Sequence, residues 1–336
     1  MLALLSRAAA SHPSGRASSR TVSELGHRGR NVSAVSEHWR RSLVPTRARD
    51  YRGRVDRAAL TRSFATAAVR TDDPVSPHVS LVQGASRGIG LAMAQAFHAR
   101  GAKIALADLQ GAEEAAQAFG GIGATVDVTR EADIAAFLDR TEAELGPVDI
   151  YVSNAGILRA DAPSWDAAGA SDKDWLDSFE VNVMGAVRGA RQVWPRMKPR
   201  GGGVFILVAS AAGLLAQIGA SSYTASKHAA VSFAESLAIT HGDDGLQVVC
   251  VCPQAVRTAM LGENSSDGGI AGADGVVEPS DVAAEAIAAI EEKRFLALPH
   301  ASVAGYEAAR ATQRDRWLGG MRKFRRMMVA ERGRPV

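Results

Sequence analysis

From residue 79 onward, short apolar runs alternate with longer segments that have the pattern of helices. The seven apolar runs are Val79–Val82, Lys103–Ala107, Ala124–Val128, Val148–Ser153, Gly203–Ala209, Leu246–Cys252 and Arg294–Leu298. Strands that alternate with helices in this way form a parallel sheet with helices on both faces. The pattern therefore predicts an α/β fold, in which a single doubly wound domain contains a seven-stranded parallel sheet.

Right-handed crossovers would place the carboxyl end of every predicted strand along one edge of this sheet, where Rossmann-type domains bind a dinucleotide. The turn after the first strand, Gly84 to Gly90, has the spacing GxxxGxG, and a helix opens at Ile89. Glycines let the backbone approach a pyrophosphate, and the amino end of a helix favours phosphate groups. We therefore predict that this turn binds a dinucleotide, although a plain glycine-rich turn would have the same composition.

Asp108 ends the second predicted strand, eighteen residues after Gly90. A carboxylate at this place can accept hydrogen bonds from both ribose hydroxyls and would repel a 2′-phosphate. The sequence therefore predicts NAD as the preferred cofactor over NADP.

Four further residues have the chemistry of a proton-transfer site. Tyr223 and Lys227 are four residues apart in a predicted helix and so share one face, where the ammonium would favour the phenolate. Ser210 follows the fifth apolar run and offers a hydroxyl that can hold a substrate oxygen close to the phenol. Asn182 lies inside a long helical segment, 173–197, where Asn is unfavourable unless its side chain has a task. Each of these residues is unspecific when taken alone, and their order and spacing along the chain decide the interpretation.

The glycine turn and the four candidate catalytic residues, in this order and spacing, resemble the short-chain dehydrogenase/reductase family over roughly residues 77 to 300. The resemblance implies an oxidoreductase that transfers a hydride between a secondary alcohol or ketone and a nicotinamide cofactor, with Tyr223 as the general acid/base. Lys227 would lower the pKa of the phenol and bind the nicotinamide ribose. Ser210 would hold the substrate oxygen, and Asn182 would distort its helix and hold a water of the proton path.

The resemblance also implies further contacts with the cofactor. Asp127 and Val128 would contact the adenine, the run 154–156 would leave room for the ribose and nicotinamide, and Val256 and Thr258 would contact the carboxamide. The complete set of expected cofactor-binding residues is Gly84, Ser86, Arg87, Gly88, Ile89, Gly90, Asp108, Asp127, Val128, Asn154, Ala155, Gly156, Tyr223, Lys227, Pro253, Val256 and Thr258.

Two alternatives stay open at this point. In the family, a cation at the position of Arg87 often meets the 2′-phosphate of NADP, so an NADPH-dependent carbonyl or oxoacyl reductase is the first alternative. A nicotinamide-binding sensor or scaffold without turnover is the second, although Tyr223 and Lys227 are both present and such sensors tend to lack them. Gln254 stands where the family usually has Gly, and it can face the substrate instead.

The expected substrate is a small alcohol or ketone of hydrophobic character. If the family geometry holds, five apolar side chains line its pocket, whereas Trp194 belongs to the core. These five side chains are Leu158, Leu214, Leu215, Ile218 and Met260.

Composition and charge are those of a soluble globular protein, with 46% hydrophobic and 22% charged residues. No apolar run reaches the ~18 residues of a membrane helix. Residues 1–70 contain fourteen Arg, no Lys and four acids, which gives +10, so the remainder carries −7 of the net charge of +3. The basic balance therefore belongs to the first seventy residues and gives no reason to expect nucleic acid at the folded domain.

The composition divides the chain into three parts. Residues 1–70 are rich in Arg and Ser without periodicity and are predicted to be disordered. They are either a mitochondrial transit peptide or upstream DNA translated from a start placed too early, and we expect a cytoplasmic protein that begins near residue 70. Residues 71–305 form the Rossmann domain, and residues 306–336 form a basic C-terminal helix and tail.

Several smaller expectations complete the sequence analysis. Cys250 and Cys252 are expected to be core thiols, and no metal-ligand cluster is apparent. The glycine-rich segment 261–272 is predicted to be a mobile flap beside the active site. The basic C-terminal helix is expected to pack its apolar side on its own domain or on a sister subunit, or else to meet a membrane surface or an acidic partner. The family resemblance implies a homodimer or homotetramer formed through the helices that carry Asn182 and Tyr223.

Overall fold

The computed structural model describes residues 78–161, 165–261, 269–272 and 274–332, which all belong to one structural unit. The predictions made for residues 1–70 lie outside these described residues. So does most of the predicted flap, of which the described part ends in the 3₁₀ turn Gly269–Gly272.

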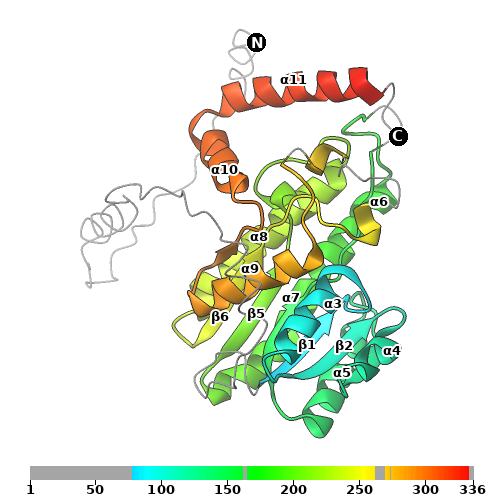
Figure 1. Ribbon diagram of the computed structural model, residues 1–336, viewed down its shortest axis with the longest axis vertical. Helices are drawn as coiled ribbons and strands as arrows, with labels where there is room; N and C mark the ends of the chain where they lie inside the picture. The colour runs from blue at the N-terminus through cyan, green and yellow to red at the C-terminus, as the bar shows by residue number, and fades with distance from the viewer. Residues whose placement is uncertain (1–77, 162–164, 262–268, 273, 333–336) are drawn as a thin grey trace, which may run out of the picture. The chain divides into compact units, whose positions relative to one another are not determined.

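Seven parallel strands form one sheet in the order β3-β2-β1-β4-β5-β6-β7 (Figure 1). They are β1 (Val79–Gln83), β2 (Lys103–Asp108), β3 (Ile122–Thr125), β4 (Val148–Ser153), β5 (Gly203–Val208), β6 (Leu246–Val251) and β7 (Leu296–Ala297). Because β1 pairs with both β2 and β4, the strand order reverses between β1 and β4. Doubly wound sheets bind their ligands outside the carboxyl ends of the strands at such a reversal. The predicted fold class and the number of strands are confirmed.

Helices cover both faces of the sheet. Side chains of α3 (Gly88–His98) and α9 (Pro279–Glu291) pack on one face, together with α4 (Ala112–Gln117). Side chains of α5 (Glu131–Glu144), α7 (Gly185–Met197) and α8 (Ser221–His241) pack on the other. The strands between these layers are apolar along their length, because a parallel sheet that is covered on both faces has no solvent-facing side.

Two predicted strands differ from the structure by more than one residue at an end, and four others differ by a single residue. β3 covers Ile122–Thr125 rather than 124–128, because Asp127 accepts hydrogen bonds from the N–H and the hydroxyl of Thr129 and turns the chain. β7 is only Leu296–Ala297, because the N–H of Arg294 still bonds to the carbonyl of Ala289 at the end of α9. A side chain thus ends β3 early, and the end of α9 delays the start of β7.

The helix predicted over 173–197 is three segments. They are α6 (Asp172–Phe179), a π-helical segment (Glu180–Met184) and α7. Asn182 lies in the π-helical segment. The helix is therefore distorted at Asn182, as the family resemblance implied. A π-helical turn inserts one extra residue into a helix and often marks a functional site.

The C-terminal part has two helices, α10 (Ser302–Thr312) and α11 (Arg314–Arg332), so the expected boundary at residue 305/306 falls inside α10. Figure 1 shows α10 leading from the body of the domain to α11, which runs across its end in red. Within the described part of the chain, no helix combines the length and the apolar character that a membrane crossing requires.

Candidate active site

A cavity of about 1410 Å³ lies at the carboxyl ends of the strands, and the loops after β1, β2, β3, β4, β5 and β6 all contribute to its wall. All but three of the predicted site residues line this cavity. The three exceptions, Ser86, Gly90 and Asn182, lie behind the wall and contact residues that form it. The fold therefore brings the separate sequence motifs together at one place.

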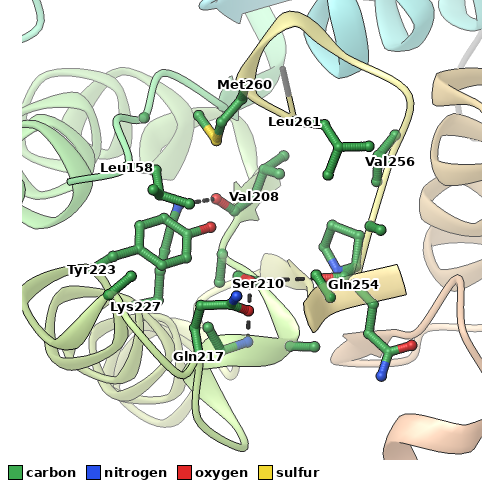
Figure 2. Close-up of a pocket in the computed structure, with 18 of the residues that line it drawn as sticks. Leu158, Val208, Ser210, Gln217, Tyr223, Lys227, Gln254, Val256, Met260 and Leu261 are labelled. Carbon is green, nitrogen blue, oxygen red and sulfur yellow. Dashed lines mark hydrogen bonds between the residues drawn. The ribbon is translucent and has the colours of Figure 1, made fainter. Parts of the chain in front are cut away.

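Tyr223 and Lys227 lie on one face of α8, one turn apart, and both are buried. Figure 2 shows the Tyr223 hydroxyl pointing into the cavity, with Lys227 behind the ring. Lys227 Nζ lies 5.7 Å from the centroid of the Tyr223 ring and donates a hydrogen bond of 3.1 Å to the carbonyl oxygen of Val208. The last carbonyl of β5 thus fixes the ammonium group beside the phenol.

Burial dominates the electrostatics of this pair. It lowers the pKa of Lys227 from its ordinary value to about 8 and raises the pKa of Tyr223, because both charged forms lose their hydration. A hydrogen bond with Ser210 opposes the rise in the pKa of Tyr223. The sequence predicted that Lys227 lowers the pKa of the phenol, but within the chain alone desolvation outweighs any such effect.

Ser210 lies two residues after the end of β5 and caps the 3₁₀ turn Ala211–Gly213 in the segment that leads to α8. Its Oγ accepts a hydrogen bond of 3.0 Å from the N–H of Ala212 and lies 3.5 Å from the carbonyl oxygen of Pro253. In Figure 2 it lies at the cavity wall near Tyr223 and Gln217. A hydroxyl held in this way can contact an oxygen that is bound beside the phenol.

Asn182 bonds to the backbone of Ile157, a residue that lines the cavity. Its Oδ1 accepts a hydrogen bond of 2.8 Å from the N–H of Ile157, and its Nδ2 donates to Ile157 O and to Ser226 Oγ, at 2.9 Å in both cases. Ser226 in turn donates to the carbonyl oxygen of Tyr223 at 2.8 Å. Sequence reasoning missed Ser226, although its place between Tyr223 and Lys227, one turn from the former, was a usable signal.

The glycine turn requires glycine at each of its three positions. Gly84 and Gly88 have φ angles of +64° and +59°, which side chains rarely adopt, and a Cβ on Gly90 would collide with the carbonyl oxygen of Gly84. Asn154 Nδ2 donates hydrogen bonds to the carbonyl oxygens of Gln83 and Gly84, at 3.1 and 2.7 Å. Asn154 therefore holds the turn in place, a role that its sequence motif did not reveal.

Asp108 is oriented by the same turn. Its Oδ2 accepts hydrogen bonds from the N–H and the Oγ of Ser86, at 2.9 and 2.8 Å, and its Oδ1 accepts one of 2.8 Å from the N–H of Leu109. Arg87, the next residue, is exposed and lines the cavity. The carboxylate is thus fixed at the end of β2 by hydrogen bonds, whereas the competing cation is exposed.

The family model for the short chain dehydrogenases matches residues 78–268, more than half of the chain. The chain belongs to this family. The predicted resemblance is confirmed, and the chain is an oxidoreductase of the nicotinamide-dependent class that the sequence led us to expect.

Relatives of the chain within the short-chain dehydrogenases act on different compounds. The chain is 32% identical over 189 residues to cis-4-hydroxycyclohexanecarboxylate dehydrogenase of Sinomonas cyclohexanicum, a match that covers 54% of this chain and 75% of the relative. It is 36% identical to 2-(R)-hydroxypropyl-CoM dehydrogenase of Xanthobacter autotrophicus, over 54% of this chain and 76% of the relative. It is 34% identical to a 3-oxoacyl-acyl-carrier-protein reductase of Escherichia coli, over 56% and 78%.

Two solved structures resemble the fold. A short-chain dehydrogenase/reductase from Burkholderia phymatum in complex with NAD has a TM-score of 0.65 and 27% identity, over 72% of this chain and 95% of that one. L-sorbose reductase from Gluconobacter frateurii, complexed with NADPH and L-sorbose, has a TM-score of 0.59 and 27% identity, over 68% and 96%. Both nicotinamide cofactors therefore occur among structures with this fold.

The expected apolar pocket of this short-chain dehydrogenase is present with one correction. Leu158, Leu215, Ile218 and Met260 line the cavity, but Leu214 is 5% exposed and packs in the core. Leu214 and Leu215 follow the 3₁₀ turn Ala211–Gly213, and only the second of them lines the cavity. Trp194 packs against the core, as predicted.

Sequence reasoning missed part of the cavity wall. Trp165, Gln217, Asp274 and Tyr306 line the cavity, and so do several residues of α11. No motif in the sequence identifies them, because they come from loops and C-terminal helices that reach the site only through the tertiary fold.

Proposed function

We propose that Tyr223 is the general acid/base of a reversible hydride transfer between a hydrophobic secondary alcohol and its ketone. The observation that carries this proposal is the placement of the Tyr223 hydroxyl in the cavity, with Lys227 behind it and Ser210 beside it. In the direction of oxidation, Tyr223 takes the hydroxyl proton of the alcohol. Ser210 holds the reacting oxygen by a hydrogen bond during this transfer.

Lys227 would act on the phenol and on the ribose of the cofactor. When bound, the nicotinamide supplies the hydride acceptor or donor. The positively charged oxidised ring and the Lys227 ammonium would together favour the phenolate of Tyr223, against the effect of burial. Lys227 is suited to this task because its amine is buried and is held by the Val208 carbonyl.

Asn182 would continue the proton path beyond Lys227. Gly156 lies between the two side chains. A Cβ built on it would lie 3.2 Å from Asn182 Oδ1 and 3.4 Å from Lys227 Nζ. The absence of a side chain at Gly156 leaves a passage between the two polar groups. This supports a relay in which a water molecule near Asn182 accepts the proton from Lys227.

The residues around the glycine turn fit a dinucleotide. No side chain caps the amino end of α3, and its first turn has no acidic residue, so the helix can present its N–H groups to a pyrophosphate. Gly84 and Gly88 leave the approach to these groups open. The remaining expected cofactor contacts, from Asp127 and Val128 to Val256 and Thr258, line the same cavity.

We propose NAD as the preferred cofactor, because Asp108 is held in place by three hydrogen bonds and a carboxylate repels a 2′-phosphate. The alternative, an NADPH-dependent carbonyl or oxoacyl reductase, is favoured by Arg87, whose exposed guanidinium also lines the cavity. One relative, the 3-oxoacyl-acyl-carrier-protein reductase of Escherichia coli, has that activity by name. A sensor without turnover is disfavoured because the Tyr223 and Lys227 pair is intact.

We further propose that the enzyme is a homodimer or homotetramer that associates through α6, α7 and α8. Two large apolar side chains on these helices, Leu176 and Ile239, are 67% and 83% exposed in the single chain. Exposed apolar side chains of this size on neighbouring helices are suited to a subunit interface.

The test of the proposed mechanism is the variant Tyr223→Phe. It removes the proton-transferring hydroxyl and keeps the ring, so turnover of secondary alcohols with NAD should fall at least about a hundredfold. Binding of NADH, followed by its fluorescence, should change little in the same variant. Substantial remaining turnover would show that another group transfers the proton.

A further inference from the structure

One side of α11 is part of the wall of the cavity that contains Tyr223. Trp317, Met321 and Phe324 have the spacing i, i+4, i+7, which places them on one face of the helix, and all three are half-buried and line the cavity. Leu318 and Met327 are 45% and 49% exposed and lie outside the lining. Three apolar side chains of α11 therefore face the cavity, next to Arg316 and Gly320, which also line it.

A chain of contacts attaches α11 to the catalytic helix. His228, next to Lys227 on α8, has Nδ1 at 3.0 Å from the carbonyl oxygen of Thr224. The carbonyl requires an N–H at Nδ1, which leaves Nε2 to accept from the Arg310 guanidinium of α10, also at 3.0 Å. Arg310 in turn lies 5.7 Å from the centroid of the Trp317 ring, within the range of a cation–π contact.

The cavity is continuous from the catalytic side chains to α11. Leu158 and Met260, which Figure 2 shows near Tyr223, belong to the same lining as Trp317 and Phe324. Its volume of about 1410 Å³ exceeds the roughly 300 to 1,000 Å³ of common ligand sites. The site can therefore hold a cofactor together with a substrate of considerable length.

The helices α10 and α11 also lie outside the segment that matches the family model, which ends at residue 268. The matched segment contributes the residues proposed for chemistry and for cofactor binding. The apolar wall on α11 comes from the part of the chain that follows it.

We infer that Trp317, Met321 and Phe324 form the far wall of the substrate site and make the enzyme selective for alcohols and ketones with an extended apolar chain. The inference rests on the proposed function, because Tyr223 marks the reacting end of the substrate. A chain that reaches α11 is removed from water, and each buried methylene improves binding about fourfold. Affinity should therefore increase with chain length up to the limit that α11 sets.

The experiment measures binding of alkan-2-ones, from butan-2-one to dodecan-2-one, to the NAD⁺ complex of the full chain by calorimetry, because a ketone bound beside the oxidised cofactor has no hydride to accept. In the wild type, affinity should rise about fourfold for each added methylene before it levels off. In the combined variant Trp317→Ala, Met321→Ala and Phe324→Ala, affinity for the longest ketones should fall at least about tenfold, while affinity for butan-2-one stays the same. The matched control is Leu318→Ala with Met327→Ala, two exposed apolar residues of α11 outside the cavity lining, which should behave as the wild type.

Three outcomes would overturn the inference. They are a wild type without any dependence on chain length, a triple variant with the same dependence as the wild type, and a control that loses as much affinity as the triple variant. A change of molecular mass by light scattering in the triple variant, with unchanged binding, would instead show that this face of α11 contacts a second copy of the chain.

The binding measurements test the role of α11, and the turnover of Tyr223→Phe tests the proposed mechanism, so the two can fail independently. If chain-length dependence is present but Tyr223→Phe still turns over alcohols, the mechanism fails and the role of α11 stands. If Tyr223→Phe is inactive but chain length has no effect on binding, the mechanism stands and the role of α11 fails.

Discussion

The ammonium group of Lys227 donates a hydrogen bond of 3.1 Å to the backbone carbonyl oxygen of Val208, the last residue of β5. A carbonyl is a neutral acceptor, so the contact orients the amine without neutralising its charge. Burial accordingly lowers the pKa of Lys227 to about 8. The same arrangement that positions the cation beside Tyr223 therefore destabilises its charged form.

This relationship predicts how stability depends on pH. The pKa of Lys227 is about 8 in the folded chain and has the ordinary value of 10.5 when unfolded, so the unfolded state binds more protons between these two values. Its contribution to the free energy of unfolding therefore rises with pH across this window. The variant Lys227→Met should be more stable than the wild type near pH ~7, by at most about 3 kcal/mol, and should lose this advantage above pH ~10.

Denaturant unfolding of both proteins over this pH range measures the difference in the free energy of unfolding. The contributions of the other titrating groups are the same in both proteins and cancel in the comparison. The variant should also be nearly inactive, since it lacks the amine. A stability difference that does not change with pH would contradict the proposed charge state of Lys227.

Asp108 should determine the choice of cofactor. Asp108→Asn removes the charge that repels a 2′-phosphate, so the ratio of NADH to NADPH affinity should fall about tenfold or more. Fluorescence titrations with NADH and, separately, with NADPH measure this ratio. The companion variant Arg87→Gln should weaken NADPH binding and leave NADH binding unchanged; an Asp108→Asn protein with the cofactor preference of the wild type would assign the selection to Arg87.

A side chain at Gly156 should disturb the site. In Gly156→Ala, the new Cβ would lie 3.2 Å from Asn182 Oδ1, which would have to move by a few tenths of an ångström, and 3.4 Å from Lys227 Nζ, at the limit of ordinary contact. We expect turnover to fall at least about tenfold, because small displacements of reacting groups have large effects on rate. Gly319→Ala, on α11 in open space, is the control and should leave turnover unchanged while stabilising the helix by up to about 1 kcal/mol.

Asn182 and Ser226 should differ in their effects on stability. Asn182→Ala leaves the N–H and the carbonyl of Ile157 without their side-chain partner, which should lower the free energy of unfolding by about 1 to 3 kcal/mol and reduce turnover. Ser226→Ala removes one hydrogen bond of the same cluster and should lower it by about 1 kcal/mol. Thermal or denaturant unfolding distinguishes the two, and equal losses would mean that Asn182 acts mainly through Ser226.

Ile239 should lie in a subunit interface. Ile239→Glu places a charge on an α8 side chain that is 83% exposed in the single chain and should shift the enzyme toward a smaller species. Light scattering on the wild type and the variant measures this. Glu291, on α9, is also exposed and offers the control Glu291→Gln, which should leave the molecular mass unchanged; a wild type that is monomeric would refute the interface.

The sequence by itself determined the fold class and the main motifs, because both depend on local order along the chain. Alternation of apolar runs with helical segments predicts a parallel sheet whose strands all end at one edge, whereas the strand order that places β1 beside β4 came from the structure. The spacing of Tyr223 and Lys227 on one helix face and the glycines of the turn are likewise local. The residues of these motifs therefore meet at the cavity where the sequence predicted them.

Only the tertiary structure decided which side chains act on one another across the site. Ser86 holds Asp108, Asn154 holds the glycine turn, and both contacts join segments that are far apart in the sequence. Hydrogen bonds of this kind have no periodicity or spacing by which they can be recognised.

The tertiary structure also decided which apolar side chains face the cavity. Leu214 packs in the core while Leu215 lines the cavity, and an apolar face on α11 reaches the same cavity from the other end of the chain. Hydrophobic side chains are buried wherever apolar surface is removed from water, so composition alone does not distinguish a core position from a substrate wall. That distinction requires the packing of the whole domain.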